Sequence, residues 1–179
     1  AQNIKPIAGA EINHVKDSSS HHEHANFTLL AKNKIGYKNL IKIISKSQIE
    51  GKNSGLPVVE SAWLSEYSKG LIALSGGFRG HIGKSVLDNN EELFLKRIKY
   101  FQKIYGEDFV LEISRINRPQ EDLYNDFILS KAGELGIPVV ATNEVRFINK
   151  EDYEAHETRV CIQNGEVLSD SKRSRTVSY

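Results

Sequence analysis

The chain has 179 residues, of which 39% are hydrophobic and 26% are charged, as in ordinary globular domains with one core. Its 24 lysine and arginine residues nearly balance 23 aspartate and glutamate residues, and a net charge of +1 gives no sign of nucleic-acid binding. A single cysteine excludes an internal disulfide and a thiolate zinc site and fits a reducing cytoplasm, and no apolar run approaches the roughly 18 residues of a membrane helix.

The first half of the chain alternates strand and helix patterns. In chain order we expect a strand at residues 4–12, a polar loop at 16–24, a strand at 27–31, a helix from Tyr37 to a break at 51–57, a short helix around Trp63 and a strand at 70–74. The long helix is predicted to bury its apolar positions at i, i+3, i+4 and i+7, which are Tyr37, Leu40, Ile41 and Ile44.

The second half repeats this alternation, with capping residues that mark the helix ends. In chain order we expect a helix from Asn89 or Asn90 to Gly106, a strand at 109–113, a helix at 120–135, a strand at 137–142 and a helix from Asn149 to about Gly165. The inner faces of the first two helices are predicted to consist of Phe94, Ile98, Phe101 and Tyr105, and of Tyr124, Phe127, Ile128 and Leu135. His156 and Cys161 are expected to be core residues.

Apolar strands that alternate with helices predict a parallel sheet covered by helices. A barrel, whole or partial, is favoured for this pattern, although an open sheet fits it nearly as well. The chain shows no internal repeat and no linker, so we expect one domain.

The strand at 137–142 delivers three polar side chains, Asn143, Glu144 and Arg146, just beyond its C-terminal end. In α/β folds that end of a strand is where ligands bind and catalysis takes place. An acid and a base two residues apart can bind a ligand together, or they can pair with each other.

Three other features invite a functional interpretation. His14, His21, His22 and His24 with Glu23 suit a metal, but most of them lie in a serine-rich loop that we expect to be solvated. The turn at 75–85 resembles a phosphate-binding loop that ends in Gly-Lys-Ser, but Phe78 occupies a required glycine position, so a tight turn is favoured. Arg115 and Arg118 follow a strand and could grip phosphate or carboxylate, with a surface role as the default. Glu112, within the strand at 109–113, is expected to face outward or to pair with a helix.

Several motifs together resemble a known family. They lie at residues 4–11, 29–33 with 36–40, 74–77, and 138–147 with 155–156. In order and spacing they are similar to the polymerase-and-histidinol-phosphatase (PHP) domain, in the form found at the N-terminus of bacterial DNA polymerase III α subunits, the C-family replicative polymerases of proteobacterial type. The chain begins at Ala1 and ends at Tyr179, and we expect it to be part of a single PHP domain that lacks the first strands and the polymerase palm, fingers and thumb.

The resemblance implies a (β/α)7-type barrel with a metal cluster at the C-terminal ends of the strands. At the positions where active members carry metal ligands, the chain has Glu11, Asn26, Gly77, Ile116, Glu144 and Arg146. Asparagine is a poor ligand for a transition metal, glycine and isoleucine supply none, and a permanently charged guanidinium takes the place of a cation. We therefore predict a metal-free PHP fold without catalytic residues, in which Arg146 pairs with Glu144, Glu11 or an acid elsewhere.

The resemblance also implies what the whole protein does. DNA-directed DNA synthesis with magnesium would reside in a polymerase domain outside this chain, which would also contact DNA. This segment would be a scaffold that docks the proofreading exonuclease subunit and other replicase subunits. Two alternatives stay open: a metal-dependent phosphoesterase or 3′–5′ exonuclease that uses His24 or His81, and a nucleotide-binding module that uses the turn at 76–85 with Lys84.

Overall fold

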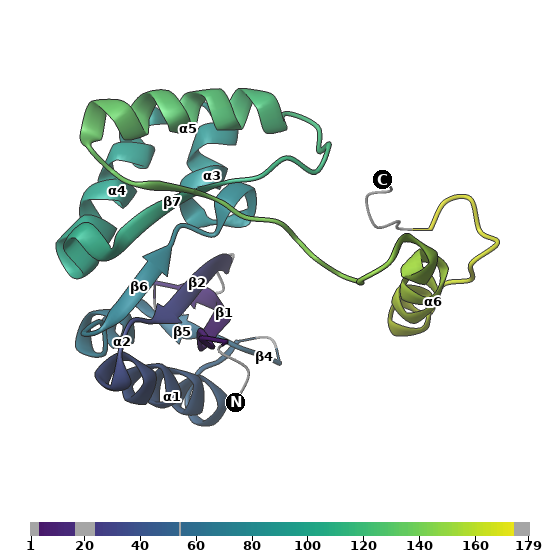
Figure 1. Ribbon diagram of the computed structural model, residues 1–179, viewed down its shortest axis with the longest axis horizontal. Coiled ribbons are helices and arrows are strands. Elements are labelled where there is room, and N and C mark those ends of the chain that lie inside the picture. Colours follow the sequence, from purple (N-terminus) through teal and green to yellow (C-terminus); the bar gives the residue numbers. More distant parts are fainter. Residues whose placement is uncertain (1–3, 17–23, 54, 174–179) are drawn as a thin grey trace.

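A mixed β-sheet with helices packed on it forms the body of the protein (Figure 1). The computed structural model describes residues 4–16, 24–53 and 55–173. Within them the main sheet has the order β5-β1-β2-β6-β7-β8, and its strands are β1 (Gly9–Val15), β2 (Ala25–Ala31), β5 (Val59–Glu60), β6 (Leu71–Leu74), β7 (Phe109–Ile113) and β8 (Val139–Ala141). A separate pair joins β3 (Lys52–Asn53) to β4 (Leu56–Pro57).

Over the described residues the helices occur in the predicted order, and there is one more than predicted. They are α1 (Lys34–Ile49), α2 (Ser61–Glu66), α3 (His81–Leu87), α4 (Glu91–Tyr105), α5 (Glu121–Leu135) and α6 (Tyr153–Asn164), with α3 an addition to the prediction. Figure 1 shows α6 set apart from the sheet, at the end of an extended stretch that follows β8. No helix in the described part of the chain is long and apolar enough to cross a membrane.

The prediction of a parallel sheet is wrong for two of the five strand pairings in the main sheet. β2 runs antiparallel to both of its neighbours, β1 and β6, while β1–β5, β6–β7 and β7–β8 are parallel. β1 ends at Val15 and β2 begins at Ala25, and this separation is shorter than the dozen or more residues that a parallel crossover needs, so the strand direction reverses. The architecture is α/β. The main sheet is open, with β5 and β8 as its edge strands, and it forms part of a barrel-type arrangement.

The first strand also starts later than predicted. β1 begins at Gly9, and the side chains of Ile4 and Ile7 before it are 74% and 69% exposed. β1 pairs with β2 from Gly9 opposite Leu30 to His14 opposite Ala25. β1 thus begins only after Pro6, which lacks the N–H that a ladder needs.

The buried face of α1 differs from the predicted one. Its buried residues are Gly36, Leu40, Ile43 and Ser47. Tyr37, Ile41 and Ile44 are 51%, 46% and 36% exposed, so only Leu40 of the predicted face is in the core. The helix is rotated because Gly36 lies directly against Gly70, where a β-carbon on Gly36 would approach the Gly70 carbonyl oxygen to 1.8 Å.

The predictions for α4 are confirmed, and those for α5 are mostly confirmed. Asn90 caps α4 by accepting a hydrogen bond from the Leu93 N–H, and the four predicted inner residues are all buried. On α5, Tyr124 and Ile128 are buried, but Leu135 is 37% exposed because it lies in the last turn. Cys161 of α6 is buried as predicted, and His156 is half-buried.

Candidate functional site

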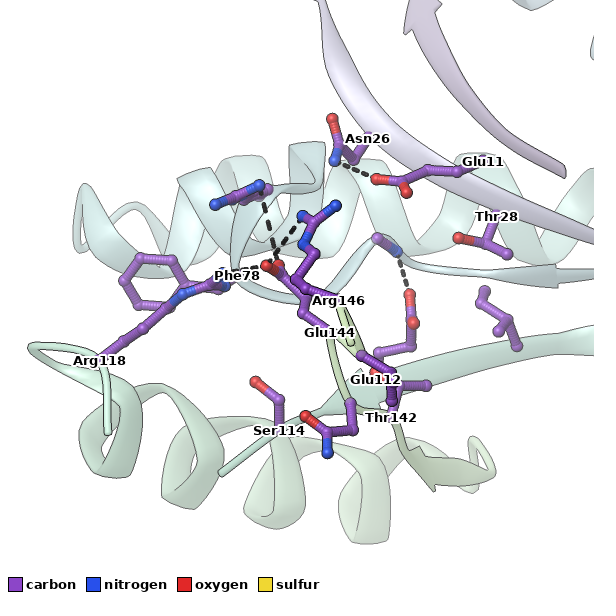
Figure 2. A pocket seen from close by; sticks show the side chains of 16 residues that line it. Glu11, Asn26, Thr28, Phe78, Glu112, Ser114, Arg118, Thr142, Glu144 and Arg146 are labelled. Carbon is purple, nitrogen blue, oxygen red and sulfur yellow. Dashed lines mark hydrogen bonds and ion pairs between the residues drawn. The ribbon is translucent and has the colours of Figure 1, made fainter. Parts of the chain in front are cut away.

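A cavity of about 320 Å³ opens where β6, β7 and β8 end (Figure 2). Each of these strands runs into a loop that supplies lining residues, at 76–79, at 114–118 and at 142–146. The antiparallel strands β1 and β2 add Glu11, Asn26 and Thr28 on another wall. The cavity therefore lies at the strand ends where the sequence placed its candidate residues.

Glu144 is the centre of the charged groups in the cavity. Its carboxylate lies 2.6 Å from Nη2 of Arg118, 3.3 Å from Nη2 of Arg146 and 3.8 Å from Nη1 of Arg79. Arg118 is the most buried of the three, with 13% of its side chain exposed, against 47% for Arg146 and 52% for Arg79. One carboxylate thus contacts three guanidinium groups from three different loops.

This arrangement favours the ionised form of Glu144. Desolvation is the largest single influence and raises the pKa of the carboxyl group, but the hydrogen bond from Arg118 and the charges of Arg79 and Arg118 outweigh it. The net result is a pKa below the ordinary value for glutamate. Glu144 is therefore a carboxylate that binds cations supplied by the protein itself.

Glu112 on β7 is the second acid in the cavity and behaves in the opposite way. It is 7% exposed and accepts a hydrogen bond from the backbone N–H of Gly76. Desolvation raises its pKa more than the Gly76 and Thr142 hydrogen bonds lower it. The neutral form of Glu112 is favoured relative to an exposed glutamate, so its charge contributes less to the cavity than that of Glu144.

The third acid, Glu11, pairs with an amide. The Asn26 side-chain N–H donates a short hydrogen bond to the Glu11 carboxylate, and Figure 2 shows this pair apart from the arginines around Glu144. Because β1 and β2 are antiparallel neighbours, the pleat brings these two side chains together.

Five of the six positions predicted for a degenerate metal site line this cavity. They are Glu11, Asn26, Gly77, Glu144 and Arg146. Ile116 does not line it: its backbone N–H donates to the buried carboxylate of Glu121 at 2.8 Å, which holds the loop after β7. Of the partners considered for Arg146, the structure has Glu144.

The histidines that the sequence offered as metal ligands are not among the residues that line this cavity. His24 is exposed, and His21, His22 and Glu23 lie outside the described residues. His14 is buried against Phe27 and Phe101, with Nε2 2.9 Å from the Ser61 hydroxyl, and desolvation followed by the nearby His81 lowers its pKa to about 3. These two histidines contact each other rather than the cavity.

The glycine-rich turn at 75–85 packs tightly against the sheet. Gly76 has φ +77°, and a β-carbon there would lie 1.9 Å from the Asn26 carbonyl oxygen. The Lys84 ammonium donates to the carbonyl of His24 at 3.2 Å and is not among the cavity-lining residues. The turn thus brings the chain against β2, which is the role favoured from the sequence.

Two residues contribute more to the cavity than their positions in the sequence predicted. Arg118, expected at the surface, is mostly buried and makes the shortest contact with Glu144. Glu112 points into the cavity rather than outward or toward a helix. Arg79, hidden in the glycine-rich turn, was not considered as a site residue. One feature of the sequence could have indicated that these three residues belong to the site. Each lies near or just after the end of a predicted strand.

The residues at this site do not fit a metal cluster. Over residues 4–16, 24–53 and 55–173, no three histidine, cysteine, aspartate or glutamate side chains come together in a way that could hold a metal ion. The acid best placed to act as a ligand, Glu144, is held by arginines. A divalent cation there would have to displace guanidinium groups that already neutralise the carboxylate.

Comparisons with known proteins agree with this architecture. The model of the PHP domain family matches residues 1–116. The chain is 42% identical to the DNA polymerase III subunit alpha of Vibrio cholerae over 98% of its length, and 41% identical to the proteins of that name from Haemophilus influenzae and Escherichia coli K12, over 96% and 98%. It spans about 15% of the length of each of these relatives.

Proposed function

The chain belongs to the PHP domain family, and from this premise we propose that it is a non-catalytic scaffold segment of a replicative DNA polymerase α subunit. The relatives whose sequences match nearly all of this chain bear the name of that subunit. DNA synthesis by the whole protein would then take place outside this segment. The segment would provide a folded surface that binds other replicase subunits, above all the proofreading exonuclease.

One observation carries the non-catalytic part of the proposal. Arg79, Arg118 and Arg146 surround Glu144 at the strand ends where metal-dependent hydrolases of similar architecture place their ions. Guanidinium groups stay protonated at any biological pH and cannot polarise a water molecule into a nucleophile as a bound cation does. Hydrolysis by this cavity would lack an agent that activates water.

The ion pairs offer a structural role instead. They connect the loops after β6, β7 and β8, so that Glu144 fixes three strand ends relative to one another. Such networks specify a fold more surely than they add net stability. A domain that lost a metal cluster and gained these arginines would hold its strand ends together by ion pairs in place of an active centre. We call this set of ion pairs around Glu144 the brace.

The docking part of the proposal is supported by the outer face of α1. Tyr37, Ile41 and Ile44 form an exposed apolar stripe, because they lie four and three residues apart on the helix. Lys34 and Lys38 flank this stripe and are exposed, and the first turn of α1 has no acidic residue. The partner that fits this surface is a protein segment with apolar anchors and acidic side chains, which we assign to the exonuclease subunit.

Metal analysis of the purified protein that carries this chain tests the non-catalytic proposal. After incubation with Zn²⁺ and Mn²⁺ and extensive dialysis, we expect no metal retained by this segment and no cleavage of a phosphodiester substrate that depends on it. The double variant Asn26→His/Arg146→His is the matched control, because it places two imidazoles at the cavity wall and should raise zinc uptake. Two or three ions bound per molecule to the unaltered cavity, or hydrolysis abolished by Glu144→Gln, would refute the proposal.

A further inference from the structure

The outer face of α4 carries a local positive charge that the net charge of the whole chain conceals. Lys96, Lys99 and Lys103 are all exposed, and steps of three and four residues place them on one face of the helix. After Glu91 and Glu92 in its first turn, α4 has no acidic residue. Among the described residues none of the three lysines pairs with a carboxylate, so their charges face the solvent.

The helix dipole accounts for one of these lysines. Lys103 lies in the last turn, where a cation interacts favourably with the carbonyl end of the helix. Lys96 and Lys99 lie in the middle turns, where this effect has faded. Arg97 between them is half-buried and donates to the carbonyl of His81, so it belongs to the packing of α3 against α4. Lys96 and Lys99 are thus the part of this face that neither the dipole nor an ion pair explains.

An aromatic ring lies between the lysines. Tyr100 comes four residues after Lys96 and three before Lys103, so it shares their face of the helix, and it is 36% exposed. Its hydroxyl donates to the backbone carbonyl of Ser61 at 3.3 Å, and its ring makes an edge contact with Phe101, with 5.2 Å between the centroids. These contacts fix the ring before a ligand arrives, which lowers the entropic cost of stacking on it.

Lysines around an exposed aromatic ring suit a single strand of nucleic acid. Ammonium groups bind successive phosphates, and a base that is free of pairing stacks on the ring. A protein partner would need apolar anchors, but α4, which the structure describes in full, exposes one large hydrophobic side chain, Tyr100. α1 differs in this respect, because Tyr37, Ile41 and Ile44 form an apolar stripe beside its lysines.

We propose that the outer face of α4 binds a single DNA strand, with its three lysines on phosphates and Tyr100 stacked on a base. The contact adds affinity without reading the sequence, because phosphates and the faces of the bases are common to all DNA. The choice of DNA over RNA rests on the proposed function. The contact itself rests on α4 alone, and none of its four residues lines the cavity around Glu144.

Binding of oligothymidylate to the whole protein, measured by fluorescence anisotropy over a series of salt concentrations, tests the lysines. On a single strand the slope of log K against log salt is about −0.7 for each phosphate neutralised. The variant Lys96→Gln/Lys99→Gln/Lys103→Gln should therefore make the slope shallower by about 2 and weaken binding at low salt by about tenfold or more. Its matched control, Lys5→Gln/Lys150→Gln/Lys172→Gln, removes the same charge from three exposed positions elsewhere and should leave both quantities at the parent values.

Replacements of Tyr100 test the stacked base. Tyr100→Phe keeps the ring and loses the hydrogen bond to Ser61, whereas Tyr100→Ala removes the ring. Photo-crosslinking to an oligothymidylate that carries 5-iododeoxyuridine, followed by peptide mapping, should place a crosslink within residues 91–105 in the parent and in Tyr100→Phe, and Tyr100→Ala should lose it. Hydrogen exchange of the α4 amides without DNA checks that each variant is folded, and the crosslink in the parent protein needs no variant at all.

Equal losses of slope and affinity in the two triple variants would overturn the inference, since they would show a diffuse effect of charge. So would crosslinks that map outside α4 alone, or tighter binding of oligouridylate than of oligothymidylate. Weaker binding of the exonuclease subunit by the α4 variant, with oligothymidylate binding unchanged, would assign this face to an acidic protein instead. Metal retention and phosphodiester cleavage are separate measurements, so an α4 that does not bind DNA would leave the scaffold proposal intact.

Discussion

Arg118 and Arg146 hold the same carboxylate but differ in burial. Arg118 keeps 13% of its side chain exposed and lies 2.6 Å from Glu144, whereas Arg146 is 47% exposed at 3.3 Å. Exposed ion pairs contribute little because water screens them, while a partly buried partner leaves a desolvated charge behind when it is removed. The brace therefore depends on Arg118 more than on the arginine that the sequence singled out.

From this difference we predict an order of destabilisation. Arg118→Ala should reduce the local opening free energy of the β7 and β8 amides by about 1–3 kcal/mol, as expected when a partner of a charged hydrogen bond is lost. Arg146→Ala should reduce it by about 1 kcal/mol or less. Native-state hydrogen exchange of the whole protein measures both, and Arg115→Ala should stay within about 0.5 kcal/mol of the parent. The reverse order, with Arg146 dominant, would contradict this account.

The pairing of Arg146 with Glu144 was within reach of sequence reasoning, since the two residues are neighbours after one strand. Arg118 was not, because 26 positions of chain separate it from Glu144 and only the parallel pairing of β7 with β8 brings the two loops together. Its burial could not be anticipated either. A charged residue in a loop is exposed by default, and only the folded cavity shows the exception.

At the scale of elements, the orientation of α1 is set by two glycines. Gly36 and Gly70 approach so closely that a β-carbon on Gly36 would meet the Gly70 carbonyl carbon at 2.5 Å and its oxygen at 1.8 Å. The capping Asn33, whose side chain accepts from the N–H groups of Ile35 and Gly36, fixes the start of the helix at the same place. Backbone contact at this point turns Tyr37 and Ile41 outward and Leu40 and Ile43 inward.

Gly36→Ala is therefore expected to destabilise the domain by about 1–3 kcal/mol, although alanine is the better helix former, because α1 must move away from backbone atoms. Gly133→Ala on α5 is the matched control. Apart from the adjoining residues of its own helix, no atom lies within 4 Å of the added β-carbon there, so the substitution should stabilise the protein by about 0.5–1 kcal/mol. Hydrogen exchange of the α1 and α5 amides measures both changes. Equal effects of the two substitutions would exclude the close approach as the determinant of helix orientation.

At the scale of the whole molecule, the outer face of α1 leaves apolar side chains exposed to solvent. The stripe of Tyr37, Ile41 and Ile44 on α1 lies outside the core, next to lysines rather than acids. Exposed apolar groups that gather on one face of a helix are typical of a surface that a partner covers. This exposed stripe is the surface to which the proposed docking role assigns the partner.

Ile41→Asp should weaken binding of the purified exonuclease subunit of the same organism by at least about tenfold, since it places a charge in the apolar contact and opposes an acidic partner. Ile162→Asp is the control, because Ile162 is also exposed, at 77%, but lies on α6. Surface plasmon resonance with the whole α-type protein measures the affinities, and unchanged hydrogen exchange in α1 confirms that the fold is intact. Equal affinities for both variants would place the docking surface elsewhere.

Patterns in the sequence were enough to predict the α/β class, the order of most helices and strands, the buried face of α4 and the family to which the chain belongs. These follow from periodicity, capping residues and motifs that are local in the chain. The direction of β2, the rotation of α1 and the convergence of three arginines on Glu144 became visible only in the folded chain; the arginines are Arg79, Arg118 and Arg146. Each of these depends on contacts between segments far apart in the chain, and the free energy of such contacts is decided by packing and desolvation rather than by local propensity.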